Sequence, residues 1–511
     1  MAIPIANSVA SWFLKKRLHQ MELFMKYPHE VQNELLHQLI EKAKNTEIGR
    51  KYDFGSMQNY EDFANRVPVQ AYEDIYQDIE RARQGESNIF WPTTIKWFAK
   101  SSGTTNAESK FIPVSVESLE ENHYAGSKDM LFMYLNNNRD GQLFRGKSLR
   151  LGGSKENYFQ HETVHGDLSA ILIDNMPFWA SYSSTPNTEI SLMSDWEVKM
   201  DAIIQTTIKE NVTSLAGVPS WMLVVLQRVL EYTGKNNLLE IWPDLEVYFH
   251  GGISFDPYLE QYQKIIPKDD FKYYEIFNAS EGFFAVQDSN DSKELLLMLD
   301  YGIFYEFIPM STYGTAKEKV IPLSEVEIGV NYALIITTNA GLWRYHIGDT
   351  VRFTSASPYR IKVTGRTKHF INAFGEEVVI ENAERALRKA AQLTQAEIID
   401  YTAAPIFMVD DEKGAHEWLI EFNTLPNNLE DFRNCLDETL REINSDYDAK
   451  RTNNMTLKKL VINIAQPKLF YTWAKSKNKL GGQNKIPRLS NNRDYLEELL
   501  ALNESLKGRR V

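Results

Sequence analysis

The sequence predicts an α/β protein built from two domains of unequal size. The chain has 511 residues, several times the usual length of one domain. Short apolar runs alternate with helical segments from about residue 90 to 360, which is typical of a mixed β-sheet covered by helices. After Gly365 the pattern changes to a shorter α+β series. We therefore expect a large N-terminal domain with mixed β-sheets over residues 1–365 and a small α+β C-terminal domain over residues 366–511.

The elements follow from apolar periodicity. Residues 7–48 have helical spacing, and helices are also expected at 195–209 and 220–231. The apolar runs expected to build the sheet lie at 148–153, 170–175, 245–252, 272–280, 283–288, 303–310 and 332–338. The small domain is expected to contain helices near 378–391 and 428–443 and strands near 397–403, 416–422 and 457–464.

Charge and composition exclude several classes of protein. The formal net charge of −13 disfavours nucleic acid as a partner. Cys435 is the single cysteine, which excludes an internal disulfide and is typical of a reducing compartment. No apolar run approaches the ~20 residues of a membrane span, and the N-terminus lacks the charge order of a signal peptide. We expect a cytoplasmic protein with no membrane partner, as a monomer or weak dimer.

The most informative segment is a hydroxyl-rich loop that follows an apolar stretch. Its glycine lets the backbone approach a ligand, its amides and hydroxyls can donate hydrogen bonds, and a lysine follows five residues later. The residues are Ser101, Ser102, Gly103, Thr104, Thr105 and Lys110. This pattern predicts a loop that binds the phosphates of a nucleotide.

A second glycine-lysine motif matches the P-loop pattern only formally. Residues 141–148 read GQLFRGKS, and an apolar stretch ends at Asp174 as in a Walker B strand. A P-loop needs a strand before it and a helix after it. Here a polar loop precedes the motif and an alternating strand follows, so we reject the P-loop interpretation.

The segment FNASEGFF contains Ser280 and Glu281 just after an apolar run. A carboxylate beside a hydroxyl at a strand end can bind Mg²⁺, which a nucleotide triphosphate would bring. The alternative is a helix N-cap with a glutamate in the first turn.

The segment GLWRYHIGD contains Arg344, Gly348 and Asp349. An aspartate after a glycine turn can accept hydrogen bonds from both ribose hydroxyls of a nucleotide. With equal weight, Asp349 could satisfy the amides of its own turn.

The C-terminal part of the chain is basic. From Lys450 onward Lys and Arg exceed Asp and Glu by ten, and the segment KSKNKLGGQNKIPR includes Lys485. Lysines on a flexible glycine turn can reach an anionic site in another domain, although a solvated basic loop is an equal alternative.

Together and in this order, the four motifs resemble the adenylate-forming superfamily of acyl-CoA ligases, peptide-synthetase adenylation domains and luciferases. The doubled serine of SSGTTNAESKFIP and the form RYHIGD are similar to the auxin-responsive Gretchen Hagen family of acyl acid amido synthetases. The N-terminal pattern of that family is also similar to three further segments, TEIGRKYDF, YEDFANRVPVQAYED and FWPTTIKWFAK. The resemblance therefore covers nearly the whole chain.

The resemblance implies a mobile C-terminal domain and two half-reactions. ATP and a carboxylic acid give acyl-AMP and pyrophosphate, and an amine, usually of an amino acid, then takes the acyl group. It implies that residues 101–105 bind phosphates, with Lys110 beside them, that Ser280 and Glu281 meet the nucleotide and Mg²⁺, and that Asp349 binds ribose. Arg366 and Lys368 fall at the hinge, and Lys485 matches the mobile catalytic lysine.

Two alternatives to the amido synthetase remain. An acyl-CoA ligase shares the adenylation step, and the run AFGEEV after the hinge is closer to those ligases. A nucleotide-binding protein without turnover is the third hypothesis. For the acyl pocket, Tyr124 and His250 lie in nearby segments, but a core role is favoured for both.

Overall fold

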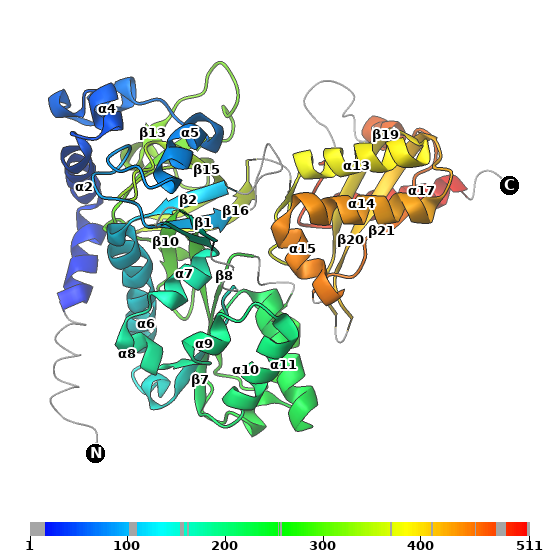
Figure 1. Ribbon diagram of the computed structural model, residues 1–511, viewed down its shortest axis with the longest axis horizontal. Helices are drawn as coiled ribbons and strands as arrows, with labels where there is room; N and C mark the ends of the chain where they lie inside the picture. Colours follow the sequence, from blue (N-terminus) through cyan, green and yellow to red (C-terminus); the bar gives the residue numbers. More distant parts are fainter. Residues whose placement is uncertain are drawn as a thin grey trace.

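The computed structural model describes most of the chain. The described residues are 16–101, 110–153, 158–160, 163–253, 255, 258–367, 370–409, 412–454, 456–476 and 487–507. Figure 1 shows a large domain on the left and a smaller one, coloured yellow to red, on the right.

The N-terminal helices cover one side of the large domain (Figure 1). Residues 16–26 are helical, followed by α2 (Pro28–Ala43), α3 (Glu47–Lys51), α4 (Tyr60–Arg66) and α5 (Tyr72–Arg83). Proline at the first position of α2 suits a helix start, where its missing N–H is not needed. Leu36, Leu39 and Ile40 share one buried face of α2, as the helical spacing of the sequence predicts.

A mixed sheet forms the centre of the large domain. Within the described residues it has 12 strands. In spatial order they are β13 (Ile321–Pro322), β12 (Ile303–Pro309), β14 (Asn331–Thr338), β15 (Tyr345–Ala356), β16 (Tyr359–Arg366), β11 (Leu295–Leu297), β10 (Gly282–Gln287), β9 (Lys272–Ala279), β8 (Val247–Gly251), β7 (Val212–Gly217), β3 (Lys147–Arg150) and β6 (Ser184–Thr185). Neighbours from β9 to β6 pair in parallel and the others pair antiparallel. This mixed sheet confirms the predicted fold class.

Helices pack around the parallel half of the sheet. They are α6 (Ala125–Asn137), α7 (Leu168–Asp174), α8 (Phe178–Tyr182), α9 (Thr188–Ser191), α10 (Trp196–Thr207), α11 (Pro219–Thr233) and α12 (Leu259–Ile265), and a π-helical turn, Ser118–Tyr124, leads into α6. The predicted strand at 170–175 is wrong, because these residues belong to α7 and its C-terminal end. A short apolar run has too few residues to distinguish a buried helix from a buried strand, and α7 buries Ala170, Ile171 and Ile173.

A smaller sheet lies beside the large one. Its strands are β2 (Lys110–Val114), β1 (Trp97–Ser101), β5 (Thr163–Gly166) and β4 (Tyr158–Gln160), in that order. β1 and β2 pair antiparallel, with Ser101 opposite Lys110. The hydroxyl-rich segment therefore connects the paired ends of two strands.

The small domain has the predicted α+β series. Its elements are β17 (Phe370–Ile371), β18 (Val378–Val379), α13 (Ile380–Thr394), β19 (Glu397–Ile406), β20 (Ala415–Thr424), α14 (Leu429–Ile443), α15 (Ser445–Arg451), β21 (Val461–Ile464), α16 (Leu469–Ser476) and α17 (Asp494–Lys507). Cys435 is half-buried on α14. The strand β16 ends at Arg366, next to the boundary predicted between residues 365 and 366.

The two domains share a hydrophobic cluster, and hydrogen bonds and a cation–π contact also join them. The Tyr258 hydroxyl donates to the carbonyl oxygen of Ala373 at 2.6 Å. The ammonium of Lys450 lies 4.2 Å from the centre of the Trp221 ring. These contacts hold α15 and the segment before β18 against the large domain.

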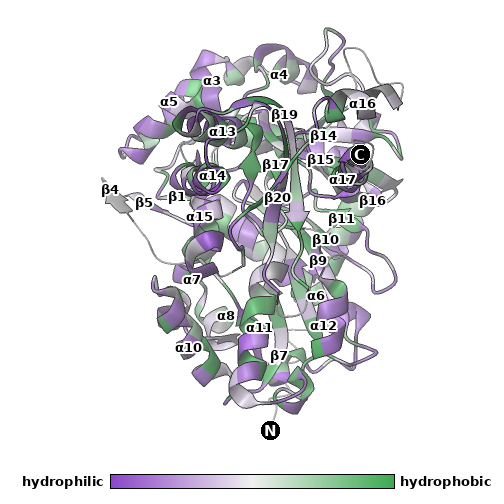
Figure 2. Ribbon diagram, turned by 90° about the vertical axis from the view of Figure 1, so that its right-hand side faces the viewer, coloured by the Kyte–Doolittle hydropathy of each residue, from purple (hydrophilic) through white to green (hydrophobic). Residues whose placement is uncertain are grey.

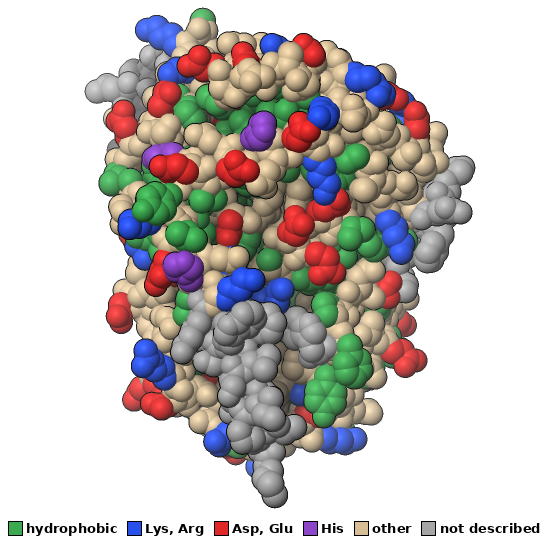
Figure 3. All heavy atoms as spheres, turned by 90° about the vertical axis from the view of Figure 1, so that its left-hand side faces the viewer, with side chains coloured by type: hydrophobic (Ala, Val, Ile, Leu, Met, Phe, Trp, Pro, Cys, Tyr) green, Lys and Arg blue, Asp and Glu red, His purple; other side chains and the backbone are tan. Residues whose placement is uncertain are grey.

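Hydrophobic residues line the interior and charges cover the outside. In Figure 2 the strands of the interior are mostly green, whereas the helices alternate between green and purple. On the face formed by the N-terminal helices, acidic and basic side chains are interspersed (Figure 3). In the part of the chain that the structure describes, no helix combines the length and apolar character needed to cross a membrane.

A buried ion pair ties the N-terminal helices to the sheet. The Arg344 guanidinium donates to both oxygens of Glu306 on β12, at 2.9 and 2.8 Å. It also donates to the carbonyl oxygens of Ala64, within α4, and Val67, just after it. Arg344 is 6% exposed and Glu306 is 1% exposed. The arginine of the GLWRYHIGD motif is therefore structural.

We expect Glu306→Gln to lower the free energy of unfolding by roughly 3–5 kcal/mol, because it leaves a buried guanidinium without its charge partner. Chemical denaturation measures the change. Lys319→Met, which removes the exposed Lys319–Glu325 pair, is the matched control and should change stability by no more than about 1 kcal/mol. Equal effects of the two substitutions would contradict the structural role of Arg344.

Candidate functional site

The hairpin of β1 and β2 brings Lys110 to the site. Lys110 begins β2 and is half-buried, with its ammonium 5.5 Å from the centre of the Tyr72 ring on α5. The Tyr72 hydroxyl accepts a hydrogen bond from the backbone N–H of Phe111 at 2.9 Å, which fixes α5 against the hairpin. Burial lowers the pKa of Lys110, and the nearby carboxylate of Glu281 opposes this effect. Ser101 ends β1, whereas Ser102, Gly103, Thr104 and Thr105 lie outside the described residues.

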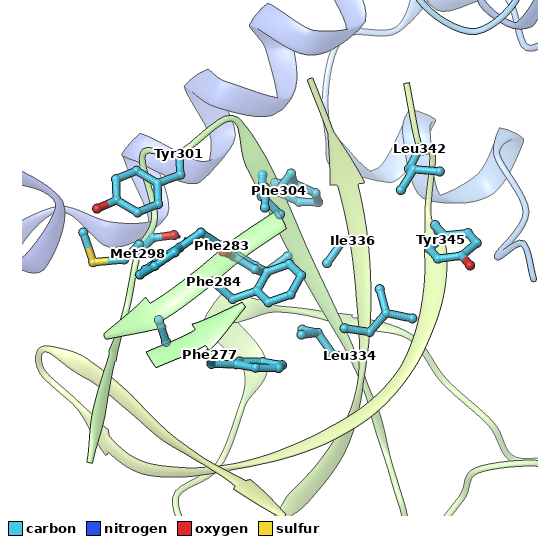
Figure 4. Packing of buried hydrophobic residues seen from close by; sticks show 14 of the residues in the cluster. Phe277, Phe283, Phe284, Met298, Tyr301, Phe304, Leu334, Ile336, Leu342 and Tyr345 are labelled. Carbon is cyan, nitrogen blue, oxygen red and sulfur yellow. Dashed lines mark hydrogen bonds between the residues drawn. The ribbon is translucent and has the colours of Figure 1, made fainter. Parts of the chain in front are cut away.

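Glu281 and Ser280 form the turn between β9 and β10. Ala279 pairs with Gly282 across this turn, so a helix N-cap, the alternative interpretation of the segment, is wrong. Aromatic side chains of both strands pack against each other, with the ring centres of Phe277 and Phe284 4.8 Å apart (Figure 4). This packing holds together the two strands that carry the turn.

The carboxylate of Glu281 has a strongly perturbed acidity. Burial raises its pKa to about 7, and the negative charge of Asp349 adds to the rise. The positive charges of Lys110 and Arg366 act in the opposite direction. These electrostatic effects place four residues predicted from the sequence, Lys110, Glu281, Asp349 and Arg366, near one another.

Asp349 lies on β15 beside Arg366 of β16. The two residues are opposite each other in the antiparallel register, and the Arg366 Nε donates to Asp349 Oδ1 at 2.7 Å. Burial raises the pKa of Asp349, and Arg366 limits that rise. The interpretation of Asp349 as a residue that satisfies its own turn is wrong, since it lies in a strand and accepts from a guanidinium.

Arg366 also reaches past the end of β16. Its Nη2 lies 3.2 Å from Oε1 of Glu377, in the AFGEEV run that leads into β18. Glu377 has a φ of 38°, an uncommon backbone conformation for a residue with a side chain. Glu377 was not predicted from the sequence, although it lies in the AFGEEV run that follows the expected hinge. We call Lys110, Glu281, Asp349, Arg366 and Glu377 the charged cluster.

The structure describes Lys147, the lysine of the rejected P-loop motif, but not the other two lysines predicted for the site. Lys368 and Lys485 lie outside the described residues. The GQLFRGKS segment contains a 3₁₀ turn, Leu143–Arg145, and continues into β3 with no helix, and Lys147 pairs with Glu210 at 2.6 Å. The rejection of a P-loop agrees with this geometry.

The two residues considered for an acyl pocket have core contacts. The Tyr124 hydroxyl donates to the carbonyl oxygen of Leu172 at 2.8 Å. The His250 ring is buried and stacks on Phe255 with ring centres 4.1 Å apart. Both contacts agree with the favoured core interpretation.

Three family domains match the chain in sequence order. The GH3 family N-terminal domain matches residues 17–271, the central domain matches 296–366 and the C-terminal domain matches 381–494. The chain belongs to the GH3 family. The resemblance inferred from the four motifs is thereby confirmed.

Similar proteins have named activities. The indole-3-acetic acid-amido synthetase GH3.4 of Arabidopsis thaliana is 24% identical over 550 aligned residues, covering 93% of this chain and 91% of that protein. The jasmonoyl–L-amino acid synthetase JAR6 of Nicotiana attenuata is 22% identical, covering 86% of this chain and 87% of that protein. Both relatives match this GH3 chain over nearly its full length.

Solved structures share the fold. The AtGH3.15 acyl acid amido synthetase in complex with 2,4-DB has a TM-score of 0.62 at 18% identity and covers 96% of this chain and 95% of its own. The 2-hydroxyisobutyryl-CoA ligase with 2-HIB-AMP and CoA has a TM-score of 0.56 at 14% identity, covering 94% and 92%. These matches confirm the predicted fold.

Because the pKa of Glu281 is raised in the folded protein, the stability of the folded protein should fall as pH rises through this range. The unfolded carboxyl titrates near 4.5, whereas the folded protein holds the proton up to about pH 7. Folding therefore takes up a proton between these values, and wild-type stability falls relative to Glu281→Gln as pH rises from about 4.5 to about 7. Thermal unfolding of the two proteins across this range measures the difference.

The control for this measurement is Glu327→Gln, which removes an exposed carboxylate outside the charged cluster. Its difference from the wild type should stay nearly constant over the same range. A wild-type curve parallel to that of Glu281→Gln would contradict the perturbed acidity of Glu281.

Proposed function

We propose that this GH3 protein is an ATP-dependent acyl acid amido synthetase. It activates a small carboxylic acid as acyl-AMP with release of pyrophosphate and transfers the acyl group to an amine, in most cases that of an amino acid. The observation that carries the proposal is the convergence of Lys110, Glu281, Asp349 and Arg366 from four separate segments of the chain. The named activities of the relatives support the same chemistry.

The charged cluster suits the parts of ATP. One oxygen of Asp349 accepts from Arg366, and the other can accept from the ribose hydroxyls. Ser101 and the loop that follows it would donate to the phosphates, and Lys110 at the far end of that loop would offset their charge. Ser280 would donate to the nucleotide from the β9–β10 turn.

Mg²⁺ fits the donor chemistry of the turn. Glu281 offers carboxylate oxygens and Ser280 a hydroxyl, and Mg²⁺ prefers oxygen ligands shared with substrate phosphates. The raised pKa of Glu281 indicates that its negative charge lacks full compensation, which a cation would supply. Bound there, Mg²⁺ would neutralise phosphate charge. Glu281 would hold it, and its carboxylate must be ionised to do so.

The chemistry explains why positive charge must converge at the α-phosphorus. A carboxylate is a weak nucleophile that approaches an anionic phosphate, so attack requires fixed donors and cations around the transferred group. Lys485, on the basic segment of the C-terminal domain, is proposed to supply this charge by domain movement about residues 366–368. The ion pair between Arg366 and Glu377 spans that hinge. It would break and form again as the domain turns.

An acyl-CoA ligase is the second candidate, because the fold of the chain also matches that of 2-hydroxyisobutyryl-CoA ligase. The acceptor of the acyl group, an amino acid or coenzyme A, distinguishes the amido synthetase from the ligase. The protein, ATP, Mg²⁺ and a panel of acids should yield amides with a mixture of amino acids and no thioester with coenzyme A. Thioester without amide would replace the proposal with the ligase.

We expect Lys485→Ala to slow acyl-AMP formation by about 10²–10³-fold while ATP affinity changes little, because its contact forms mainly in the transition state. Rapid-quench single turnovers and equilibrium ATP binding measure the two effects. Lys479→Ala, in the same basic segment, is the control and should keep the wild-type rate. A wild-type rate of acyl-AMP formation in Lys485→Ala would contradict the catalytic role of Lys485, and no acyl-AMP formation by the wild type would favour a nucleotide-binding protein without turnover.

Localisation in the cytoplasm and a monomeric or weakly dimeric state stay predictions from the sequence.

A further inference from the structure

The turn between β17 and β18, residues 372–377, carries Glu377 of the charged cluster. Two of its residues have a left-handed backbone conformation, with a φ of 85° at Gly375 and of 38° at Glu377. A residue with a side chain keeps such a conformation only where surrounding contacts hold it, and residues of this kind gather at functional sites. The conformation of this turn therefore depends on support from the rest of the small domain.

A buried carboxylate organises the turn from the inside. Glu376 accepts hydrogen bonds from the backbone N–H groups of Ala373 at 3.2 Å and Phe374 at 2.6 Å. The Nε2 of His416, on β20, donates to Glu376 Oε1 at 2.7 Å, and both of these side chains are 0% exposed. The Nδ1 of His416 has no hydrogen-bond partner within the described part of the chain, where the ring therefore donates to Glu376 alone. Loss of this donor would leave a buried carboxylate incompletely satisfied, which is costly.

The backbone of Glu377 is held from both sides. Its N–H donates to Asn372 Oδ1 at 3.3 Å, and its carbonyl oxygen accepts from Nδ2 of Asn444, just before α15, at 3.1 Å. The side chain of Glu377 is 21% exposed and extends to Arg366, whose Nη2 lies 3.2 Å from Oε1. The two neighbouring acids therefore differ in their contacts, because Glu376 shapes the turn and Glu377 meets the arginine of the expected hinge.

The charge of Glu377 indicates which half-reaction this arrangement suits. The charged cluster has three carboxylates and two cations, so it carries an excess of negative charge while Glu377 is part of it. Burial raises the pKa of Asp349, and the charge of Glu377 adds to this rise. A triphosphate beside Glu377 would be repelled. Acyl-AMP carries less negative charge once pyrophosphate has left, and an acceptor amino acid brings an ammonium group that Glu377 attracts.

We propose that His416 and Glu376 are positioning residues for acyl transfer, the second half-reaction. Their buried contact fixes the turn that presents Glu377 to Arg366. The ion pair between Glu377 and Arg366 then holds the small domain in the arrangement in which the acceptor amine reacts. A looser turn weakens this ion pair, and the arrangement becomes less populated. This role rests on the proposed amido synthetase function.

Separate assays of the two half-reactions test this role. Pyrophosphate exchange measures acyl-AMP formation, and rapid quenching measures the rate at which enzyme-bound acyl-AMP reacts with a mixture of amino acids. We expect His416→Leu, which removes the donor to Glu376, to lower the ratio of transfer to exchange at least about tenfold, because a small misplacement in a site is costly. His416→Gln, whose amide nitrogen can still donate, should retain most of the wild-type ratio.

A double-mutant cycle shows whether His416 acts through Glu377. Glu377→Gln should lower the same ratio, and the addition of His416→Leu should lower it little further, because the ion pair is already lost. Effects that multiply would overturn the proposal. If His416→Leu does not fold, Glu376→Gln takes its place in the cycle, since it removes the buried charge and keeps the size of the side chain.

Thr394→Val is the matched control. It removes a buried hydrogen bond, from Thr394 Oγ1 to the carbonyl oxygen of Ala390 at 2.7 Å, at the end of α13 away from the turn. It should lower stability without a change in the ratio, because a smaller amount of folded enzyme slows both half-reactions equally.

The outcomes separate this role from the proposed function. An unchanged ratio in His416→Leu, with exchange and amide formation in the wild type, would overturn the role of His416 alone. A folded wild type that gives no exchange or no amide would overturn the proposed function, and the role of His416 with it.

Discussion

The ion pair between Asp349 and Arg366 is the contact on which the site depends. It joins β15 to the last residue of β16, and Arg366 continues to Glu377 on the far side of the expected hinge. One guanidinium thus sets the position of the proposed ribose ligand and connects it to the segment about which the small domain would turn. Without this cation, three carboxylates, those of Glu281, Asp349 and Glu377, would face one another in a poorly solvated space.

The alternation of charge in the cluster has a chemical consequence. Lys110 and Arg366 reduce the repulsion among the acids, yet burial still raises the pKa of Glu281 to about 7. The cluster is therefore short of positive charge before any ligand binds. A nucleotide that arrives with Mg²⁺ would bring the missing cation, and the phosphates would meet the loop between Ser101 and Lys110. In the proposed reaction the last positive charge comes from Lys485 on the basic C-terminal segment.

The sequence predicted the fold class, most strands and most members of the charged cluster, and it did so for identifiable reasons. Ser101 and Lys110 flank a segment rich in hydroxyl groups, Glu281 follows a strand and Asp349 follows a glycine, so each motif contains the local pattern from which it was predicted. The failures also have physical causes. Residues 170–175 are too few to show a period, and the role of Arg344 depends on Glu306, 38 positions away in the chain. The contact between Arg366 and Glu377 is a tertiary property that no local pattern encodes.

The central claim is that the charged cluster is the nucleotide site of an adenylating enzyme. The most direct measurement is acid-dependent exchange of labelled pyrophosphate into ATP, for the wild type and for Asp349→Ala, with Asp291→Ala as an exposed control outside the cluster. We predict exchange with at least one acid of a broad panel for the wild type and the control, and its loss in Asp349→Ala. Exchange that is unchanged in Asp349→Ala, or absent from the folded wild type with every acid, would contradict the account.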